Sequence, residues 1–248
     1  MPKIEISEER GVRFLHFGSP WIQGAMRIAR PYALELEYTR DLMFPLVLHE
    51  PEWPASVLQV GLGTASVTKF LYRHRPAARV TVVEISEQVI MAAYQYFRLP
   101  EPSDRLRVEL ADGHDFLAKT PRKFDFIVVD GYDEKGRAGM LETLPFYLNC
   151  RARLSRRGIL AVNLVTRTRG VRPGTDRLRE AFEDRVLVLP PSEAGNIVAI
   201  AAAGQAVGDD WEALRSSATA LKAASGLNLL PALARAQRAA RGDSGLRL

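Results

Sequence analysis

The chain has little cysteine, no long apolar run and no apolar leader. A single cysteine, Cys150, among 248 residues excludes a disulfide within the chain and a metal site built from several cysteines. No apolar run approaches the ~20 residues that a membrane-spanning helix needs. The segment that begins at Met1 lacks the apolar core of a secretion signal. We therefore expect a cytoplasmic protein without a membrane partner, with Cys150 as a small core residue on a helix.

Metal-ligand spacing and a strong charge bias are missing as well. The four histidines have no ligand spacing, so we expect no metal. The formal net charge of +5 permits contact with nucleic acid but does not require it, and we do not expect nucleic acid as a partner. Two basic clusters, residues 167–172 and the tail at 235–247, are interpreted as solvated surface charge. RNA or another acidic substrate is the alternative for the first cluster.

A hydrophobic content of 47% is enough for one α/β domain with a small appendage. We divide the chain into residues 1–50, a β-hairpin module with a linking helix, and residues 51–248, the main domain. The hairpin would pair Val12–Phe17 with Trp21–Ile28, and the helix would cover Ala33–Leu48. So small a module needs support from the main domain or another subunit, and we expect a dimer or larger homo-oligomer.

From Val57 onward, apolar runs alternate with helical patterns. We expect strands at residues 57–60, 80–84, 106–110, 124–129, 158–164, 185–189 and 196–202, and helices at 65–73, 87–97, 115–119, 146–154, 211–224 and 227–240. Repeated βα units predict an α/β fold with a doubly wound, mostly parallel sheet. The last two strands have a proline-rich connection, residues 190–195, so they would form an antiparallel hairpin at the edge.

The turn after the first of these strands points to a nucleoside ligand. Gly61 and Gly63 let a ligand approach the backbone, and the following helix offers free N–H groups. Glu84 ends the next strand, where a carboxylate can accept hydrogen bonds from both ribose hydroxyls. Ser66 stands near the place of the third glycine of the dinucleotide fingerprint, so S-adenosyl sulfonium cofactors fit better than NAD. A generic tight turn is the alternative interpretation.

Three more acids follow strand ends, where ligands bind in open α/β sheets. Asp112, before Gly113, could accept a hydrogen bond from the adenine amine, or it could simply cap a helix. Asp130 and Asp133 follow a wholly apolar strand and would create a negative pocket in a basic protein. Such a pocket suits an amine that is held as an ammonium and deprotonated to become a nucleophile, although an ordinary turn has the same composition.

The order of these motifs resembles the polyamine aminopropyltransferase (spermidine synthase) family, as a divergent bacterial-type member. The resemblance runs from about Phe14 to Leu164. The segments that carry it are Gly18-Ser-Pro-Trp-Ile-Gln23, Glu37-Tyr38, Phe44-Pro-Leu-Val-Leu-His49, Gly61-Leu-Gly63, Val82-Val-Glu-Ile-Ser86, Ala111-Asp-Gly-His-Asp-Phe116 and Phe124–Asp133. It implies a small β-rich module before a Rossmann-like transferase domain that uses S-adenosylmethionine-type donors, assembled as dimers or tetramers.

The resemblance also implies roles for individual residues. Glu84 would hold the ribose, Asp112 the adenine, and Gln23 would contact the nucleoside. Asp130 would deprotonate the attacking amine and Asp133 would hold the diamine. Tyr38 would contact the bound substrate. Independently of the resemblance, Tyr147 lies on the helix after the loop that follows Asp133, so it would either line the pocket or pack in the core. The implied reaction transfers an aminopropyl group from decarboxylated S-adenosylmethionine to a diamine such as putrescine.

The chain also departs from the family pattern. Thr64 stands where the family has an aspartate that binds the amine of the transferred chain, and the loop after Asp133 lacks the usual prolines. Three hypotheses follow: an aminopropyltransferase, a methyltransferase that uses intact S-adenosylmethionine, or a family member that binds a nucleoside or polyamine without turnover.

Overall fold

A large central sheet forms the framework of the molecule. The computed structural model describes residues 3–165, 172–191, 196–240 and 243–248, and within these ranges the central sheet has seven strands. Their order is β6-β5-β4-β7-β8-β10-β9. Their bounds are β4 Ser56–Val60, β5 Arg79–Glu84, β6 Leu106–Leu110, β7 Phe124–Val129, β8 Leu154–Val165, β9 Val186–Val188 and β10 Asn196–Ala202.

The pairing of these strands confirms the predicted fold class. From β6 to β8 neighbouring strands are parallel, whereas β10 is antiparallel to both β8 and β9. The edge hairpin predicted from the proline-rich connection is therefore present. The chain order reverses between β4 and β7, and in sheets of this type the crevice at the carboxyl ends of such strands is the usual ligand site.

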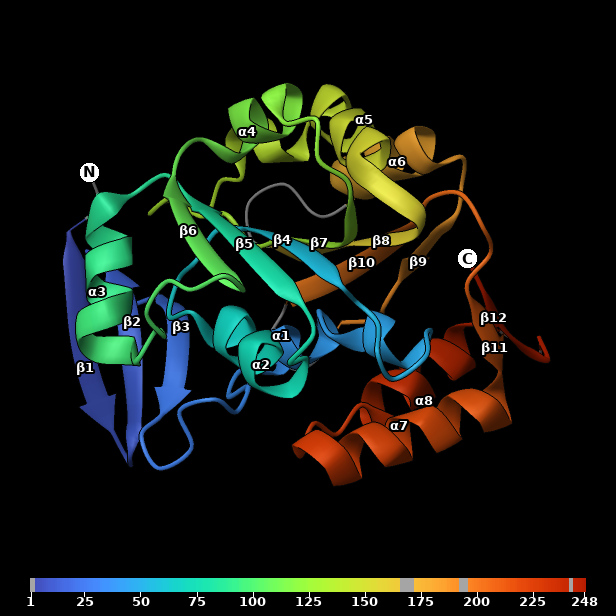
Figure 1. The fold of residues 1–248 in the computed structure, drawn as a ribbon, viewed down its shortest axis with the longest axis horizontal. Coiled ribbons are helices and arrows are strands. Elements are labelled where there is room, and N and C mark those ends of the chain that lie inside the picture. Colours follow the sequence, from blue (N-terminus) through green and yellow to red (C-terminus); the bar gives the residue numbers. More distant parts are fainter. Residues whose placement is uncertain (1–2, 166–171, 192–195, 241–242) are drawn as a thin grey trace.

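Helices cover both faces of the sheet. In Figure 1, α4, α5 and α6 lie on one face, while α1, α2, α7 and α8 lie on the other. The bounds are α1 Glu37–Asp41, α2 Ser66–His74, α3 Glu87–Phe97, α4 Gly113–Lys119, α5 Leu144–Arg153, α6 Arg172–Phe182, α7 Trp211–Ser225 and α8 Leu230–Ala239. Helix α6 was not predicted, because its sequence is mostly polar. None of the described helices combines the length and the apolar content that a membrane crossing needs.

The amino-terminal module is a sheet rather than a hairpin. Among the described residues it has three antiparallel strands, β1 Ile4–Glu9, β2 Val12–Phe17 and β3 Ile22–Arg27. Strand β1 was missed because most of its side chains are exposed, so its apolar alternation is weak. Leu15 and Met26 of this sheet pack with Phe97 at the end of α3, so the module rests on the main domain. Support from a second subunit stays a prediction.

Two other segments differ from the prediction. Instead of one helix over Ala33–Leu48, the chain forms the short α1 and a 3₁₀ helix, η1 Phe44–Val47. Pro45 lies in the first turn of η1 and has no N–H to donate, so it starts a new helix more readily than it continues one. At the carboxyl end, β11 Gly208–Asp210 pairs with β12 Gly245–Arg247. Residues 241–242, within the basic tail at 235–247, lie outside the described ranges.

Candidate active site

A cavity of about 780 Å³ lies at the carboxyl ends of β4, β5 and β7. Its wall comes from the amino-terminal sheet, the start of α1, the loops after these strands, the end of β8 and the start of β10. Most residues predicted for the site from the sequence contribute to this wall. They are Gln23, Tyr38, Gly61, Gly63, Glu84, Asp112, Gly113, Asp130 and Asp133.

The glycine turn after β4 brings two parts of the cavity into contact. Gly61 has φ of +90°, and a Cβ atom there would lie 2.2 Å from the backbone oxygen of Asp130. Only glycine adopts this conformation so close to another backbone segment. Gly63 also has positive φ, at +52°, and lies beside the backbone oxygen of Gln23 in β3. The turn therefore joins the amino-terminal sheet to the loop that carries Asp130.

Glu84 is buried at the end of β5 and holds this turn from the other side. Its Oε2 accepts a hydrogen bond from the backbone N–H of Leu62 at 2.8 Å, and its Oε1 accepts one from Ser86 at 2.9 Å. Burial raises the pKa of Glu84, while these backbone hydrogen bonds oppose that shift. Each oxygen can accept a second hydrogen bond, so the carboxylate can still receive ribose hydroxyls.

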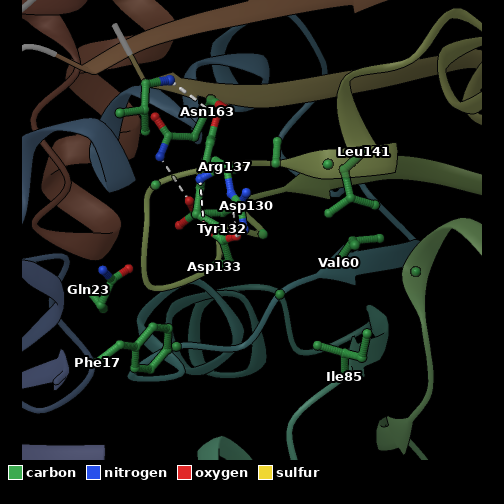
Figure 2. Close-up of a pocket in the computed structure, with 18 of the residues that line it drawn as sticks. Phe17, Gln23, Val60, Ile85, Asp130, Tyr132, Asp133, Arg137, Leu141 and Asn163 are labelled. Atoms are coloured by element: carbon green, nitrogen blue, oxygen red, sulfur yellow. Dashed lines mark hydrogen bonds and ion pairs between the residues drawn. The ribbon is translucent and has the colours of Figure 1, made fainter. Parts of the chain in front are cut away.

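Asp112 has the capping role that was weighed from the sequence, and its contact with adenine stays a prediction. It caps α4, because its Oδ1 accepts hydrogen bonds from the backbone N–H groups of His114 at 2.8 Å and Asp115 at 3.0 Å. The residue is exposed and also lines the cavity. A Cβ atom on Gly113 would lie 2.3 Å from Cγ1 of Val60, so the start of α4 packs tightly on β4. Figure 2 shows Val60 and Ile85 together in this part of the cavity.

The same corner contains the one group of potential metal ligands found among the described residues. Ligand atoms of Asp112, His114 and Asp115 lie within 4.8 Å of one another. Asp115 pairs with Lys119 at 2.9 Å, and both aspartates are exposed. The geometry gives this group ordinary roles as a helix cap and a surface ion pair. The absence of a metal stays a prediction from the sequence.

Asp130 directly follows β7 and also lines the cavity. Its Oδ1 accepts a hydrogen bond from the side-chain amide of Asn163 at 2.8 Å, and Tyr38 also hydrogen-bonds to its carboxylate. Asn196, the first residue of β10, donates to the side-chain oxygen of Asn163 at 3.0 Å. Burial raises the pKa of Asp130, and the hydrogen bonds from Asn163 and Tyr38 oppose that shift. A positioned carboxylate with a raised pKa can act as a general base.

Sequence reasoning missed Asn163 and Asn196. Asn163 stands within an otherwise apolar run of β8 and is 3% exposed, and a buried polar side chain in such a strand needs a partner. That signal was available in the sequence. The identity of its partner was not, because Asn163 and Asp130 are 33 residues apart in the chain. Tyr132 also contributes here, since its hydroxyl donates to the backbone oxygen of Asn163 at 2.6 Å.

Asp133 lies in the loop after β7, and its carboxylate is already paired. Arg137 of the same loop donates from Nε at 2.8 Å and lies with its Nη2 at 2.7 Å from Asp133 Oδ2. Figure 2 shows Asp130, Tyr132, Asp133 and Arg137 gathered in one part of the cavity, near Asn163. Burial favours the protonated acid, but hydrogen bonds from Arg137 and the loop backbone hold the pKa of Asp133 below its ordinary value.

Glu37, in the first turn of α1, lines the cavity beside Tyr38. Arg235 of α8 lies 3.3 Å from Glu37 and also donates to Asp41. The side chain of Arg235 is 13% exposed, so this guanidinium is enclosed between α1 and α8. The carboxyl-terminal helices thus contact the helix that presents Tyr38, a link that no sequence motif predicted.

Two sequence-derived residues lie outside the cavity wall. Tyr147 is fully buried, and α5 turns it into the core beside Phe146 and Cys150, which agrees with the core-packing alternative and not with a place on the cavity wall. Thr64 is also buried, with its Oγ1 at 2.9 Å from Ser66 Oγ, and it packs against Gly24 of β3. Thr64, which the resemblance places at the family's amine-binding aspartate, is therefore not part of the cavity wall. Residues 167–171 of the basic cluster 167–172 lie outside the described ranges, and Arg172 begins α6.

Comparisons with known proteins agree with this geometry. The Spermine/spermidine synthase domain model matches residues 35–164. A polyamine aminopropyltransferase from Chromobacterium violaceum is 36% identical over 227 residues, which cover 92% of this chain and 86% of that protein. An eEF1A lysine and N-terminal methyltransferase from Mus musculus is 31% identical over 126 residues, which cover 47% of this chain and 18% of that protein.

Solved structures with a similar fold include enzymes of both kinds. A probable spermidine synthase from Corynebacterium glutamicum has a TM-score of 0.68 and 21% identity, covering 80% of this chain and 76% of its own. Human methyltransferase-like protein 13 with SAH has a TM-score of 0.65 and 23% identity, covering 84% and 95%. A spermidine synthase with the transition state analogue AdoDATO has a TM-score of 0.60 and 22% identity, covering 81% and 74%. At these identities the likeness establishes the fold.

Proposed function

Because this chain belongs to the spermine/spermidine synthase family and is a transferase, we propose that it moves an aminopropyl group from decarboxylated S-adenosylmethionine to a diamine such as putrescine. The products would be a longer polyamine and methylthioadenosine. The observation that carries the proposal is the half-buried carboxylate of Asp130, which Asn163 and Tyr38 hydrogen-bond and whose backbone touches the glycine turn. A base in this position lies between the nucleoside end and the amine end of one cavity.

The nucleoside would bind on the Glu84 side. We propose that Glu84 receives the ribose hydroxyls and that Asp112 receives the adenine amine. Gly61, Gly63 and Gly113 would keep this surface free of side chains, and Gln23 would contact the nucleoside. The solved spermidine synthase with AdoDATO, a transition state analogue, supports a donor of this type.

The chemical step needs correctly positioned reactants and a base. The amine nitrogen of the acceptor attacks the carbon of the aminopropyl group that is bonded to the sulfonium sulfur, and the bond between that carbon and the sulfur breaks. The electron pair stays on sulfur, which becomes the neutral thioether of methylthioadenosine. The acceptor must lose a proton, and Asp130 would take it while Tyr38 and Asn163 hold the carboxylate. Asp133 would attract the second ammonium.

Product analysis tests this proposal directly. The purified chain is incubated with decarboxylated S-adenosylmethionine or with S-adenosylmethionine, and with diamines of different length. We expect methylthioadenosine and a polyamine with the decarboxylated donor. Failure to form either product with any amine, at protein concentrations that give a clear signal for an active spermidine synthase, would contradict the proposal.

A methyltransferase that uses intact S-adenosylmethionine is the second candidate. Two observations favour it. Thr64 is buried where the family has its amine-binding aspartate, and the mouse eEF1A methyltransferase matches about half of the chain. The same experiment separates the two, because methyl transfer would release S-adenosylhomocysteine. Nucleoside binding without either product would support the third hypothesis, a member that binds without turnover.

A further inference from the structure

Arg137 already pairs with Asp133, the carboxylate that the second ammonium of a diamine would need. Its guanidinium contacts Asp133 Oδ2 through Nε at 2.8 Å and through Nη2 at 2.7 Å, and both residues line the cavity. We propose that Arg137 is a tethered cation that occupies the site of the acceptor's second ammonium, so that a diamine binds by displacing it. The inference rests on the proposed function, because it concerns the amine end of the same site.

The loop does not need this guanidinium to keep its shape. The backbone N–H of Asp133 donates to the backbone oxygen of Arg137 at 3.1 Å, and Gly136 donates to the backbone oxygen of Asp133 at 3.0 Å. Asp133 Oδ1 accepts two further backbone hydrogen bonds, from Lys135 and Arg137, each at 2.9 Å. These four bonds remain when the side chain of Arg137 leaves. An incoming ammonium can therefore take its place on Oδ2 without rebuilding the loop.

Exposure makes Arg137 a cation that can leave. Its side chain is 62% exposed, and Asp133 is 32% exposed, so water replaces the lost contacts easily. The other paired acid at this end behaves differently. Arg235, the partner of Glu37, is 13% exposed and also contacts the buried Asp41. Of the two arginine-paired acids described at the amine end, Asp133 is the one whose arginine an acceptor ammonium can displace.

This competition sets specificity as well as affinity. An acceptor with two ammonium groups recovers the charge pairing that it breaks, whereas an acceptor with one ammonium does not use Asp133. Exposed pairs contribute little, so we expect the tethered cation to weaken diamine binding by about two- to five-fold. Arg137 is thus a specificity-determining residue and not a group that reacts.

Calorimetry tests the proposal with wild type and Arg137→Gln, each saturated with methylthioadenosine. The titrants are 1,4-diaminobutane and pentylamine, in which a methyl group replaces the second ammonium. We expect Arg137→Gln to bind the diamine about two- to five-fold more tightly, by the same estimate for an exposed pair. Pentylamine affinity should be unchanged. Lys135→Gln removes a charge from the same wall but keeps the backbone N–H that donates to Asp133 Oδ1, and it should change diamine affinity less.

A double-mutant comparison separates displacement from a loop effect. In an Asp133→Asn background, Arg137→Gln should no longer alter diamine affinity, because the competing site is gone. Unchanged or weaker diamine binding in Arg137→Gln would overturn the inference, and so would a complete lack of diamine binding in both proteins. If wild type transfers the aminopropyl group but wild type and Arg137→Gln bind the diamine equally well, the inference fails and the proposed function stands. The expected affinity pattern without any transfer would overturn only the proposed function.

Discussion

The proposed nucleoside end and the proposed amine end of the cavity are built in different ways. The proposed nucleoside end comes from consecutive βα units, and backbone contacts fix it: Gly61 against the Asp130 backbone, and Glu84 against the N–H groups of Leu62 and Ser86. The proposed amine end is assembled from α1, the loop after β7, the end of β8 and the start of β10, and side-chain contacts connect it. Backbone contacts tolerate few substitutions, so donor recognition should be the fixed part of this site and acceptor recognition the variable part.

The largest expected effect tests whether the amine end carries the chemistry. Asp130→Asn keeps the shape of the side chain but removes its basicity, so kcat should fall by ~10²–10⁴-fold, the usual contribution of a positioned base. Methylthioadenosine affinity, measured by calorimetry, should persist because the glycine turn and Glu84 are intact. Asp104→Asn, an exposed change outside the cavity wall, is the control. Wild-type turnover by Asp130→Asn near neutral pH would remove Asp130 from the role of base.

The next effect tests the nucleoside end by itself. Glu84→Gln should weaken methylthioadenosine binding by ~1.5–3 kcal/mol, the range for hydrogen bonds to a charged group. The backbone N–H groups of Leu62 and Ser86 each donate to one oxygen of this carboxylate, and Gln keeps only one oxygen. The variant should therefore lose one of these hydrogen bonds and be less stable, so thermal unfolding must be measured as well. The exposed Glu87 on α3 gives a matched control as Glu87→Gln. Unchanged affinity in folded Glu84→Gln would exclude Glu84 from the site.

A smaller effect, confined to low pH, tests the link between β8 and the base. The hydrogen bond from Asn163 favours ionised Asp130 and so lowers its pKa against the effect of burial. Asn163→Leu removes that bond, which raises the pKa of Asp130 further. Because the base must be ionised, the acid limb of the kcat profile should move to higher pH, and the rate should recover as the pH rises. An unshifted acid limb would show that Asn163 does not tune the base.

The difference between the ends also explains how far the sequence could be interpreted. The glycine turn, Glu84 and the acid after β7 are local motifs at strand ends, and the parallel sheet brings strand ends together. The partners of Asp130 and Glu37 come from positions far along the chain, Asn163 and Arg235, where no motif marks them. The short β1 and the polar α6 were missed for a related reason, since packing, not a strong periodic signal, determines them.

Tyr147 shows that a position next to a motif does not predict where a side chain points. It follows the loop after Asp133, as a pocket residue would, but the orientation of α5 decides where a side chain points. That helix packs Phe146, Tyr147 and Cys150 in one core cluster, so the ring is not part of the cavity wall. The Tyr147 hydroxyl is buried and has no hydrogen-bond partner among the described residues. Tyr38, by contrast, lines the cavity and hydrogen-bonds to Asp130.

The smallest expected effect therefore comes from Tyr147→Phe, compared with Tyr38→Phe. Removing an unpaired buried hydroxyl breaks no hydrogen bond, so stability should change by less than about 1 kcal/mol and could rise. The KM for the diamine should stay within about two-fold, because a loss of one typical hydrogen bond would cost more. Tyr38→Phe removes a bond to the base and should lower kcat while both variants remain folded. A rise in diamine KM for Tyr147→Phe, with unchanged thermal stability, would return that residue to the site and would mean that the amine end extends behind the wall formed by the loop after β7.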